Sequence, residues 1–167
     1  MKEGFNIIIK DNFLDDKLFN NLHKQISYFY FQPKENYLGE EKKHPWFAAP
    51  ASEEITEIIK NKCEKIFRKK FKVNMCNYTL LATTEPLPHN DFTEDCDYQV
   101  IIYIKGNTNL HKGTGFYLNG VLNTHIGFNE NRAVLWHANT THSPLNWASD
   151  DKSKRYSIIC QLKEVKY

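Results

Sequence analysis

The stretch Pro88–Phe92, PHNDF, is the part of the sequence on which the fold assignment depends. It places a histidine and an aspartate two positions apart, directly after a proline. Residues i and i+2 of an extended strand point to the same side, so His89 and Asp91 can face one interior while Asn90 faces away. One imidazole and one carboxylate are two of the three protein ligands of a non-haem Fe(II) site with open positions. Alone, the pattern also fits a solvated turn.

Two histidines in Arg132–Leu145, RAVLWHANTTHSPL, are candidates for the third ligand. Arg132–Trp136 predicts a strand, and His137 lies at its end, where the chain enters a polar turn. His142 begins the next strand, where a side chain can face inward. We therefore expect His142 to be the ligand and His137 to lie at the surface or beside the site. The other histidines are expected to be structural or solvent-exposed: His23, His44, His111 and His125.

The sequence around these motifs predicts a β-rich core. After Phe71 the helical period disappears, and short β-branched and aromatic runs alternate with turn residues. Such closely spaced short strands are typical of an antiparallel sandwich or barrel. The expected strands are Met75–Thr83, Tyr98–Ile104, Gly115–Leu118, Asn123–Ile126, Ala133–Trp136, His142–Leu145 and Arg155–Leu162.

The first third of the chain predicts a short strand and two helices. The strand lies in FNIIIKDNF, and Asp15 and Asp16 open a helix that we expect Pro33 to stop. Ser52 is a good N-cap for the second helix, whose apolar stripe runs from Ile55 to Phe71. Between them, Lys34–Pro50 is polar and irregular, either a loop that covers a site or a connector. The fold class is therefore α+β.

The composition is that of an ordinary globular protein: 167 residues, 41% hydrophobic and 25% charged, with a net charge of +2. The length suits one domain. The small net charge gives no reason to expect a nucleic-acid or membrane partner, and Arg68-Lys69-Lys70 fits a solvated helix end. The four cysteines form no CxxC pair, and no apolar run suits a signal peptide or a membrane span. We expect a cytoplasmic protein with free, buried thiols.

The segment Lys154–Leu162, KRYSIICQL, begins a strongly apolar strand with a charged residue. Arg155 and Ser157 share a face by the strand period. An arginine inside a barrel is costly without an anion, and its forked guanidinium matches a carboxylate with two hydrogen bonds. The alternative is an exposed arginine at the start of the strand.

The order of Tyr78, PHND, GTGFY, NRAVLW, His142 and RYS resembles the Fe(II)/2-oxoglutarate-dependent dioxygenases, in their prolyl-hydroxylase-like branch. The resemblance covers about Tyr78 to Leu162. It implies a double-stranded β-helix, or jelly-roll, core with N-terminal helices packed on one sheet. The chain would then be a single domain, 1–167, in which 1–72 is a strand with helical support and 73–167 is the jelly-roll core.

The resemblance also implies a role for particular residues. The implied iron ligands are His89, Asp91 and His142. The implied 2-oxoglutarate contacts are Arg155, Ser157, Tyr78 and Tyr103, and the last is equally well explained as a core aromatic. Thr114 and Phe116 in GTGFY depart from the family pattern, so we expect no specific hydrogen-bonding role there. Gln161 stands where nucleic-acid demethylases of the family carry a second arginine, and Asp91 stands where halogenating members carry a small residue.

The implied activity is hydroxylation of an unactivated C–H bond in a protein side chain, an amino acid or a small metabolite. It would use Fe(II), 2-oxoglutarate and O2, release succinate and CO2, and be supported by ascorbate. Gln32–Pro50 and Phe92–Tyr98 would flank the site, and Gln32–Pro50 could act as a lid. The alternatives are a cupin-like metal-binding barrel that does not use 2-oxoglutarate, and a non-catalytic binding module. The sequence fixes neither the substrate nor the oligomeric state.

Overall fold

The computed structural model describes residues 6–34, 46–81, 88–145 and 154–166. Its elements are β1 (Ile8–Lys10), α1 (Asp16–Gln25), the 3-10 helix η1 (Ile26–Tyr28), β2 (Gln32–Lys34), β3 (Trp46–Pro50), α2 (Glu53–Phe67), β4 (Phe71–Leu81), β5 (Tyr98–Lys105), β6 (Gly113–Leu118), β7 (Val121–Gly127), β8 (Ala133–His137), β9 (His142–Leu145) and β10 (Arg155–Glu164). All seven strands expected from the β-rich part are present, with ends shifted by a few residues at most.

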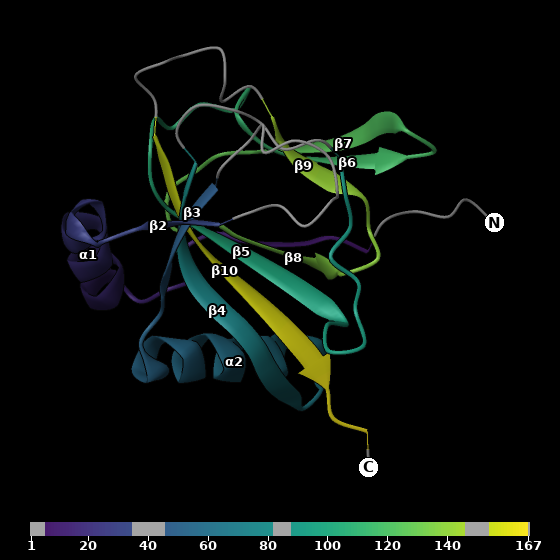
Figure 1. The fold of residues 1–167 in the computed structure, drawn as a ribbon, viewed down its shortest axis with the longest axis horizontal. Coiled ribbons are helices and arrows are strands. Elements are labelled where there is room, and N and C mark those ends of the chain that lie inside the picture. The colour runs from purple at the N-terminus through teal and green to yellow at the C-terminus, as the bar shows by residue number, and fades with distance from the viewer. Residues whose placement is uncertain (1–5, 35–45, 82–87, 146–153, 167) are drawn as a thin grey trace.

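Two antiparallel sheets make up the core (Figure 1). The large sheet has seven strands in the order β1-β8-β5-β10-β4-β3-β2, and the small sheet has three in the order β7-β6-β9. A single bridge between His89 and His142 extends the small sheet beyond β9. Strands that are distant in the sequence are neighbours in the sheet. For example, β10 lies between β5 and β4 and pairs with both. This is the expected jelly-roll arrangement, with helices added at its N-terminal end.

The first helix begins as expected but ends early. The Asp15 side chain accepts a hydrogen bond from the Leu18 amide at 3.0 Å and caps α1. The helix tightens into η1 at Ile26, so Pro33 does not terminate it as expected. Pro33 instead lies in β2, the edge strand of the large sheet, where proline is tolerated because one side of an edge strand needs no amide donor.

The second helix begins and ends at identifiable residues. The Ser52 hydroxyl accepts from the Ile55 amide at 3.3 Å, which confirms the predicted cap. The helix ends at Arg68, whose φ of 54° is left-handed. Phe71 therefore belongs to β4 and does not continue the helical stripe as expected. The buried positions on α2 are Ile55, Ile59 and Cys63.

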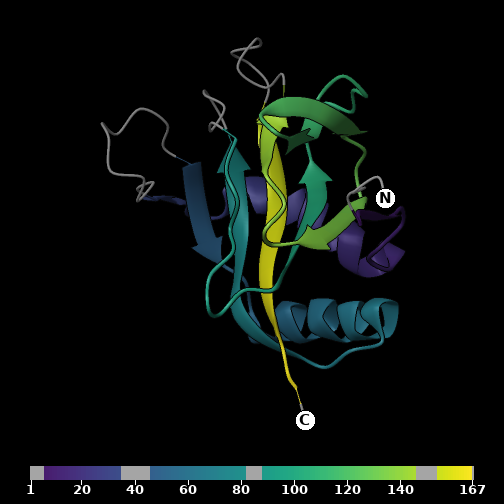
Figure 2. The same ribbon diagram turned by 90° about the vertical axis from the view of Figure 1, so that its right-hand side faces the viewer.

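The large sheet separates two apolar interiors. One lies between the sheet and the helices, and it includes Ile26, Ile59 and Ile158. The other lies between the two sheets, inside the barrel, and includes Phe116 and Trp136. Figure 2 shows α2 running across the strand direction of the large sheet. The helices therefore support the sheet from behind and leave the barrel interior to the two sheets.

The segment Lys34–Pro50 is not irregular throughout, as the sequence suggested. Lys34 belongs to β2 and Trp46–Pro50 forms β3, which pairs with β4. Residues 35–45 lie outside the described part of the chain, so the possible lid stays a prediction. None of the described helices is long and apolar enough to cross a membrane.

All four cysteines are buried and free, as expected. Burial raises the pKa of the Cys63 thiol to about 12 and that of Cys96 to about 11. Cys76 and Cys160 lie directly opposite each other on β4 and β10, and the hydrogen bond between them, together with burial, raises the pKa of Cys160. The same hydrogen bond lowers the pKa of Cys76. Thiols held in the protonated form are poor nucleophiles, so Cys63, Cys96 and Cys160 act as core side chains.

Candidate metal centre

His89 and His142 are brought together by the backbone. The His89 amide donates to the His142 carbonyl at 3.0 Å, and the His142 amide donates back at 2.8 Å. The Asp91 amide donates to the Ala138 carbonyl at 3.1 Å. His89 and Asp91 thus lie in an isolated bridge and its continuation, not in the regular strand that the sequence suggested. Their side chains nevertheless converge.

The three predicted ligands form one cluster. One ligand atom from each of His89, Asp91 and His142 lies within 4.8 Å of the others. Asp91 Oδ2 is 3.2 Å from His142 Nε2 and 3.9 Å from His89 Nε2. Two imidazole nitrogens and one carboxylate oxygen are the donor set of a facial non-haem Fe(II) site, which leaves the remaining coordination positions open.

The orientation of His142 shows why a cation fits this cluster. His142 Nδ1 lies 3.0 Å from the Thr140 carbonyl oxygen, which can only accept, so Nδ1 carries a proton. In neutral His142, Nε2 then presents a lone pair to Asp91 Oδ2, a buried atom with no hydrogen-bond partner among the described residues. The lone pair on Nε2 and the carboxylate oxygen repel each other. A proton or a metal ion between the two atoms removes this repulsion.

The pKa of Asp91 reflects the same surroundings. Burial raises it, but the imidazoles of His142 and His89 and the side chain of Gln99 near the carboxylate lower it by more. The pKa is therefore lowered, and the carboxylate is ionised at neutral pH, as a metal ligand must be.

The cluster is buried on one side and open on the other. The His142 side chain is 7% exposed, and its ring packs 4.8 Å from that of Trp136. His89 and Asp91 are 28% and 23% exposed, and the neighbouring Phe92 is a solvent-exposed aromatic. The open side of the cluster is therefore the side of His89, Asp91 and Phe92, and His142 and Trp136 lie on its buried side.

The remaining described histidines are not in the cluster. His137 is exposed at the end of β8, and its ring packs 4.6 Å from that of Tyr98. His23 lies 3.1 Å from Glu130, and His111 is exposed. The choice of His142 over His137 therefore agrees with the geometry. His44 lies outside the described residues.

The predicted cosubstrate residues gather further along the same barrel interior. Arg155 is 6% exposed, donates from Nη1 to the Gly113 carbonyl at 3.2 Å, and lies 5.7 Å from the centre of the Tyr103 ring. Ser157, on the same face of β10, is fully buried, and its hydroxyl oxygen has no hydrogen-bond partner in the described part of the chain. A guanidinium beside a hydroxyl that lacks a partner suits a ligand carboxylate.

Residues next to this position are also constrained. The Tyr103 hydroxyl and Thr114 Oγ1 share a hydrogen bond of 2.7 Å, although we expected no specific role for Thr114. Gly113 has a φ of 154°, and a β-carbon there would collide with the Ile126 carbonyl oxygen. Only glycine therefore lets β6 approach closely enough for its carbonyl to accept from Arg155.

Tyr78 does not belong to this group, and its predicted 2-oxoglutarate contact is wrong. On β4 it pairs with Ile158 and faces the helices, where its ring packs 4.8 Å from that of Phe29. The residues of β4 that share the face of Arg155 and Ser157 are Leu81 and Thr79. The spacing before His89 matched the family, but the alternation of side chains along β4 turns Tyr78 to the opposite face.

Two buried polar side chains beside the metal cluster, Gln99 and Trp136, were not predicted from the sequence. They are directly opposite each other on β5 and β8, and both face the barrel. The signal for Gln99 in the sequence was a single glutamine in the apolar run YQVIIYIK. It lies an even number of positions from Tyr103, so the two side chains share one face of the strand.

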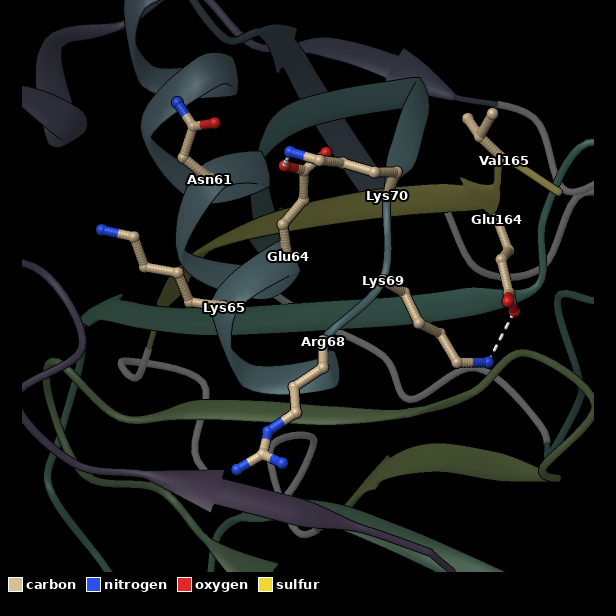
Figure 3. Close-up of a pocket in the computed structure, with 8 residues that line it drawn as sticks. All are labelled: Asn61, Glu64, Lys65, Arg68, Lys69, Lys70, Glu164 and Val165. Atoms are coloured by element: carbon tan, nitrogen blue, oxygen red, sulfur yellow. Dashed lines mark hydrogen bonds and ion pairs between the residues drawn. The ribbon is translucent and has the colours of Figure 1, made fainter. Parts of the chain in front are cut away.

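A basic hollow lies elsewhere, at the end of α2 (Figure 3). Its volume is about 670 Å³, and its lining residues are Asn61, Glu64, Lys65, Arg68, Lys69, Lys70, Glu164 and Val165. Lys69 lies 2.6 Å from Glu164 and donates to the Tyr98 hydroxyl at 2.8 Å, and these bonds raise its pKa to about 12. Lys70 lies 2.7 Å from Glu64. Because two of its cations are paired within the protein, the hollow fits a structural helix end better than a nucleic-acid site.

Comparison with known proteins supports the fold. No family model and no curated protein matches the sequence. A prolyl hydroxylase from Trichoplax adhaerens, in complex with a hypoxia inducible factor oxygen degradation domain peptide fragment, superimposes with a TM-score of 0.72 at 14% identity, over 93% of this chain and 82% of that one. A Pseudomonas putida prolyl-4-hydroxylase gives 0.72 at 12% identity, over 96% and 94%. An oxidoreductase of the 2OG-Fe(II) oxygenase family from Burkholderia pseudomallei gives 0.71 at 11% identity, over 94% and 84%.

These similarities define the class of fold. The chain has the jelly-roll fold of the Fe(II)/2-oxoglutarate-dependent oxygenases, in the form found in prolyl hydroxylases. The resemblance recognised in the sequence is therefore confirmed for the fold. At this level of identity the site and its chemistry have to be argued from the chain's own residues.

Proposed function

We propose that this chain is an Fe(II)- and 2-oxoglutarate-dependent dioxygenase that hydroxylates an unactivated C–H bond. The observation that carries the proposal is the contact between Asp91 Oδ2 and His142 Nε2 at 3.2 Å, with His89 beside them. With neutral His142, these two atoms direct lone pairs at each other in a half-buried cluster, which fits a bound cation. When Fe(II) and 2-oxoglutarate are bound, they would supply the oxidation of a C–H bond by O2, with release of succinate and CO2.

The residues divide the work between the two ends of the barrel interior. His89, Asp91 and His142 would hold the metal and leave its open positions toward the cosubstrate and the substrate. Arg155 and Ser157 would bind the distal carboxylate of 2-oxoglutarate, and Tyr103 would line the same position. Burial raises the pKa of Tyr103, so its hydroxyl stays protonated and able to donate. The apolar side chains Ile101 and Val134 lie on the same wall and exclude water between the two ends.

The substrate class stays open among a peptidyl side chain, an amino acid and a small metabolite. One structural neighbour is bound to a peptide fragment, which supports including peptides. The partly exposed edge at His89 and Asp91, with exposed Phe92 beside it, also suits a substrate that reaches the metal from outside. A cytoplasmic location and a single-domain organisation stay predictions.

The test measures metal binding and cosubstrate turnover on the purified chain. We expect one Fe(II) or Co(II) per chain, and succinate release from 2-oxoglutarate with Fe(II) and ascorbate, at least slowly without the primary substrate. Metal binding without any binding or turnover of 2-oxoglutarate would favour the cupin-like alternative. If no metal binds at all, the chain is better explained as a non-catalytic module.

A further inference from the structure

We propose that Cys76 and Cys160 form a redox-modification site, where a peroxide joins the two thiols in a disulfide that links the first and last strands of the jelly-roll core. β4 carries Cys76, β10 carries Cys160, and the two residues are directly opposite each other. The chain between them contains strands β5 to β9 and the whole metal cluster. The inference does not depend on the proposed function.

The backbone hydrogen bonds of the two residues point away from each other. The Cys76 carbonyl accepts from the Ala51 amide at 3.0 Å, so the backbone of Cys76 faces the β3 side of β4 and not β10. The Ser157 carbonyl on β10 accepts from the Thr79 hydroxyl on β4 at 3.4 Å. Backbone groups alternate in direction along a strand, so Cys160 directs its own toward β5. Cys76 and Cys160 are therefore a non-hydrogen-bonded cross-strand pair.

The spacing of such a pair suits a disulfide. The Cα atoms of a non-hydrogen-bonded antiparallel pair are about 4.5 Å apart, and its side chains are closer together than those of a hydrogen-bonded pair. A disulfide joins residues whose Cα atoms are about 4.4–6.8 Å apart. Both thiols also lie in the same interior, the helix-side core. The bond can therefore form without a change in strand register.

The two thiols differ in how a small oxidant reaches them. Cys76 is 9% exposed, whereas Cys160 is fully buried. The pairing of β3 with β4 runs from Leu80 to Asn77, so from Cys76 onward this edge of β4 has no paired strand in the described part of the chain. Cys76 is therefore the thiol that meets a peroxide first, and Cys160 is the thiol that completes the bond.

The reaction is a two-electron oxidation in two steps. Hydrogen peroxide converts the Cys76 thiol to a sulfenic acid and releases one water. The Cys160 sulfur then attacks the sulfenic sulfur, the S–S bond forms, the S–O bond breaks, and the hydroxyl leaves with the Cys160 proton as a second water. The two thiols lose two electrons, and the peroxide gains them. A protonated thiol reacts slowly with an oxidant in solution, but its position opposite Cys76 favours reaction within the pair.

Cys63 of α2 is a third thiol in the same core. It lies on a helix, so no strand pairing holds it opposite Cys76 or Cys160. The three thiols are not a metal site, since within the described residues the metal cluster is the one group of three or more ligating side chains close enough to hold an ion. The core therefore contains one pair of thiols in register and a separate helix thiol, which serves as an internal comparison.

The test treats the full-length, reduced chain with hydrogen peroxide, in the presence of a chelator that removes free iron. The remaining thiols are blocked, the chain is digested, and the peptides are mapped by mass spectrometry with and without dithiothreitol. We expect one linked pair of peptides, carrying Cys76 and Cys160, that dithiothreitol separates. The oxidised chain should unfold at a higher urea concentration than the reduced chain, because the bond closes a long loop in the unfolded state.

Cys63→Ala is the matched control. It removes a buried thiol from the same core but leaves the cross-strand pair intact, so it should form the same disulfide and show the same rise in urea midpoint on oxidation. Cys76→Ala removes one member of the pair and should show neither. The mapping itself uses the unchanged chain, so the test stays decisive if a variant folds poorly.

Three results would overturn the inference. In the first, peroxide leaves both thiols reduced, and the pair is then part of the core packing only. In the second, the mapped bond joins Cys63 to one of the pair, or Cys76 is oxidised to a sulfinic acid without a cross-link. In the third, the Cys76–Cys160 bond forms but lowers the urea midpoint, which would mean that the native strands do not accommodate it. None of these results depends on metal or 2-oxoglutarate binding, so the proposed function is tested separately.

Discussion

Neighbouring residues of β10 enter two different interiors. Tyr156, Ile158 and Cys160 face the helices and join an apolar core. Arg155 and Ser157 alternate with them, face the barrel, and are equally buried. One strand therefore supplies both the structural support and the candidate site, and the period of two along the strand keeps them apart.

The two interiors differ in how their polar atoms are satisfied. Within the described residues, the buried side-chain polar atoms without a hydrogen-bond partner are Asp91 Oδ2, Gln99 Oε1, Trp136 Nε1, Ser157 Oγ and His125 Nε2. None belongs to the helix-side core. Each such atom costs about 1–3 kcal/mol unless something pairs with it. An interior that receives ligands is expected to hold buried polar atoms that the protein itself leaves without a partner. The helix-side core holds none of the atoms named above and is stabilised by apolar packing.

The largest expected effect comes from removing a metal ligand on the barrel side. His142→Ala should abolish stoichiometric Co(II) and Fe(II) binding, and with it any succinate release, because a two-ligand site no longer holds the ion. His137→Ala is the matched control, since that side chain is exposed and packs on Tyr98. Metal content after dialysis measures both. Loss of metal in His137→Ala with retention in His142→Ala would reverse the ligand assignment.

The next effect should appear at the other end of the barrel. Arg155→Met removes the guanidinium but keeps an apolar side chain against Tyr103. We expect the KM for 2-oxoglutarate to rise about 100-fold, the scale for losing one member of a buried charge pair. Co(II) affinity should stay unchanged, because the metal ligands are at the opposite end. An unchanged KM would remove Arg155 from cosubstrate binding, and a parallel loss of metal would show that the two ends are not independent.

A change on the helix side should lower the stability of the protein and leave metal and cosubstrate binding unchanged. Ile158 is fully buried against the helices, and Ile158→Ala should lower the free energy of unfolding by about 2–5 kcal/mol through lost burial and a cavity. Urea unfolding measures it. In the folded protein, Co(II) affinity and the KM for 2-oxoglutarate should match those of the unchanged chain. A variant of normal stability with weakened metal binding would contradict the division between the two interiors.

The same division explains what the sequence could predict. The clustering of His89, Asp91 and His142 could be predicted because a histidine and an aspartate two positions apart, followed by a histidine in a later strand, form an informative order along the chain. The strands were found because β-branched and aromatic runs mark them. Gln99 was not found because a polar residue gains meaning only when the face it occupies is known. Tyr78 was misassigned for the same reason, since spacing to His89 does not determine which side of β4 a residue faces.

The short strands β2 and β3 could not be predicted from local pattern either. Pro33 lies in β2 and Pro50 ends β3, and proline normally argues against a strand. Both strands form because β4 offers an edge to pair with, and β3 then offers one to β2. Pairing with a distant segment overrides local propensity here, which is information that only the assembled sheet contains.

The smallest expected effect compares two tyrosines on opposite faces. Tyr103→Phe removes a hydroxyl inside the barrel, next to Arg155 and bonded to Thr114, and should raise the KM for 2-oxoglutarate about 3- to 10-fold, the scale of one hydrogen bond. Tyr78→Phe removes the same group from the helix side and should leave that KM unchanged. Steady-state succinate release over a range of 2-oxoglutarate concentrations measures both. Because the chemical change is identical, a larger effect at Tyr78 could arise only if β4 presented its other face to the barrel, and the register that separates support from site would then be wrong.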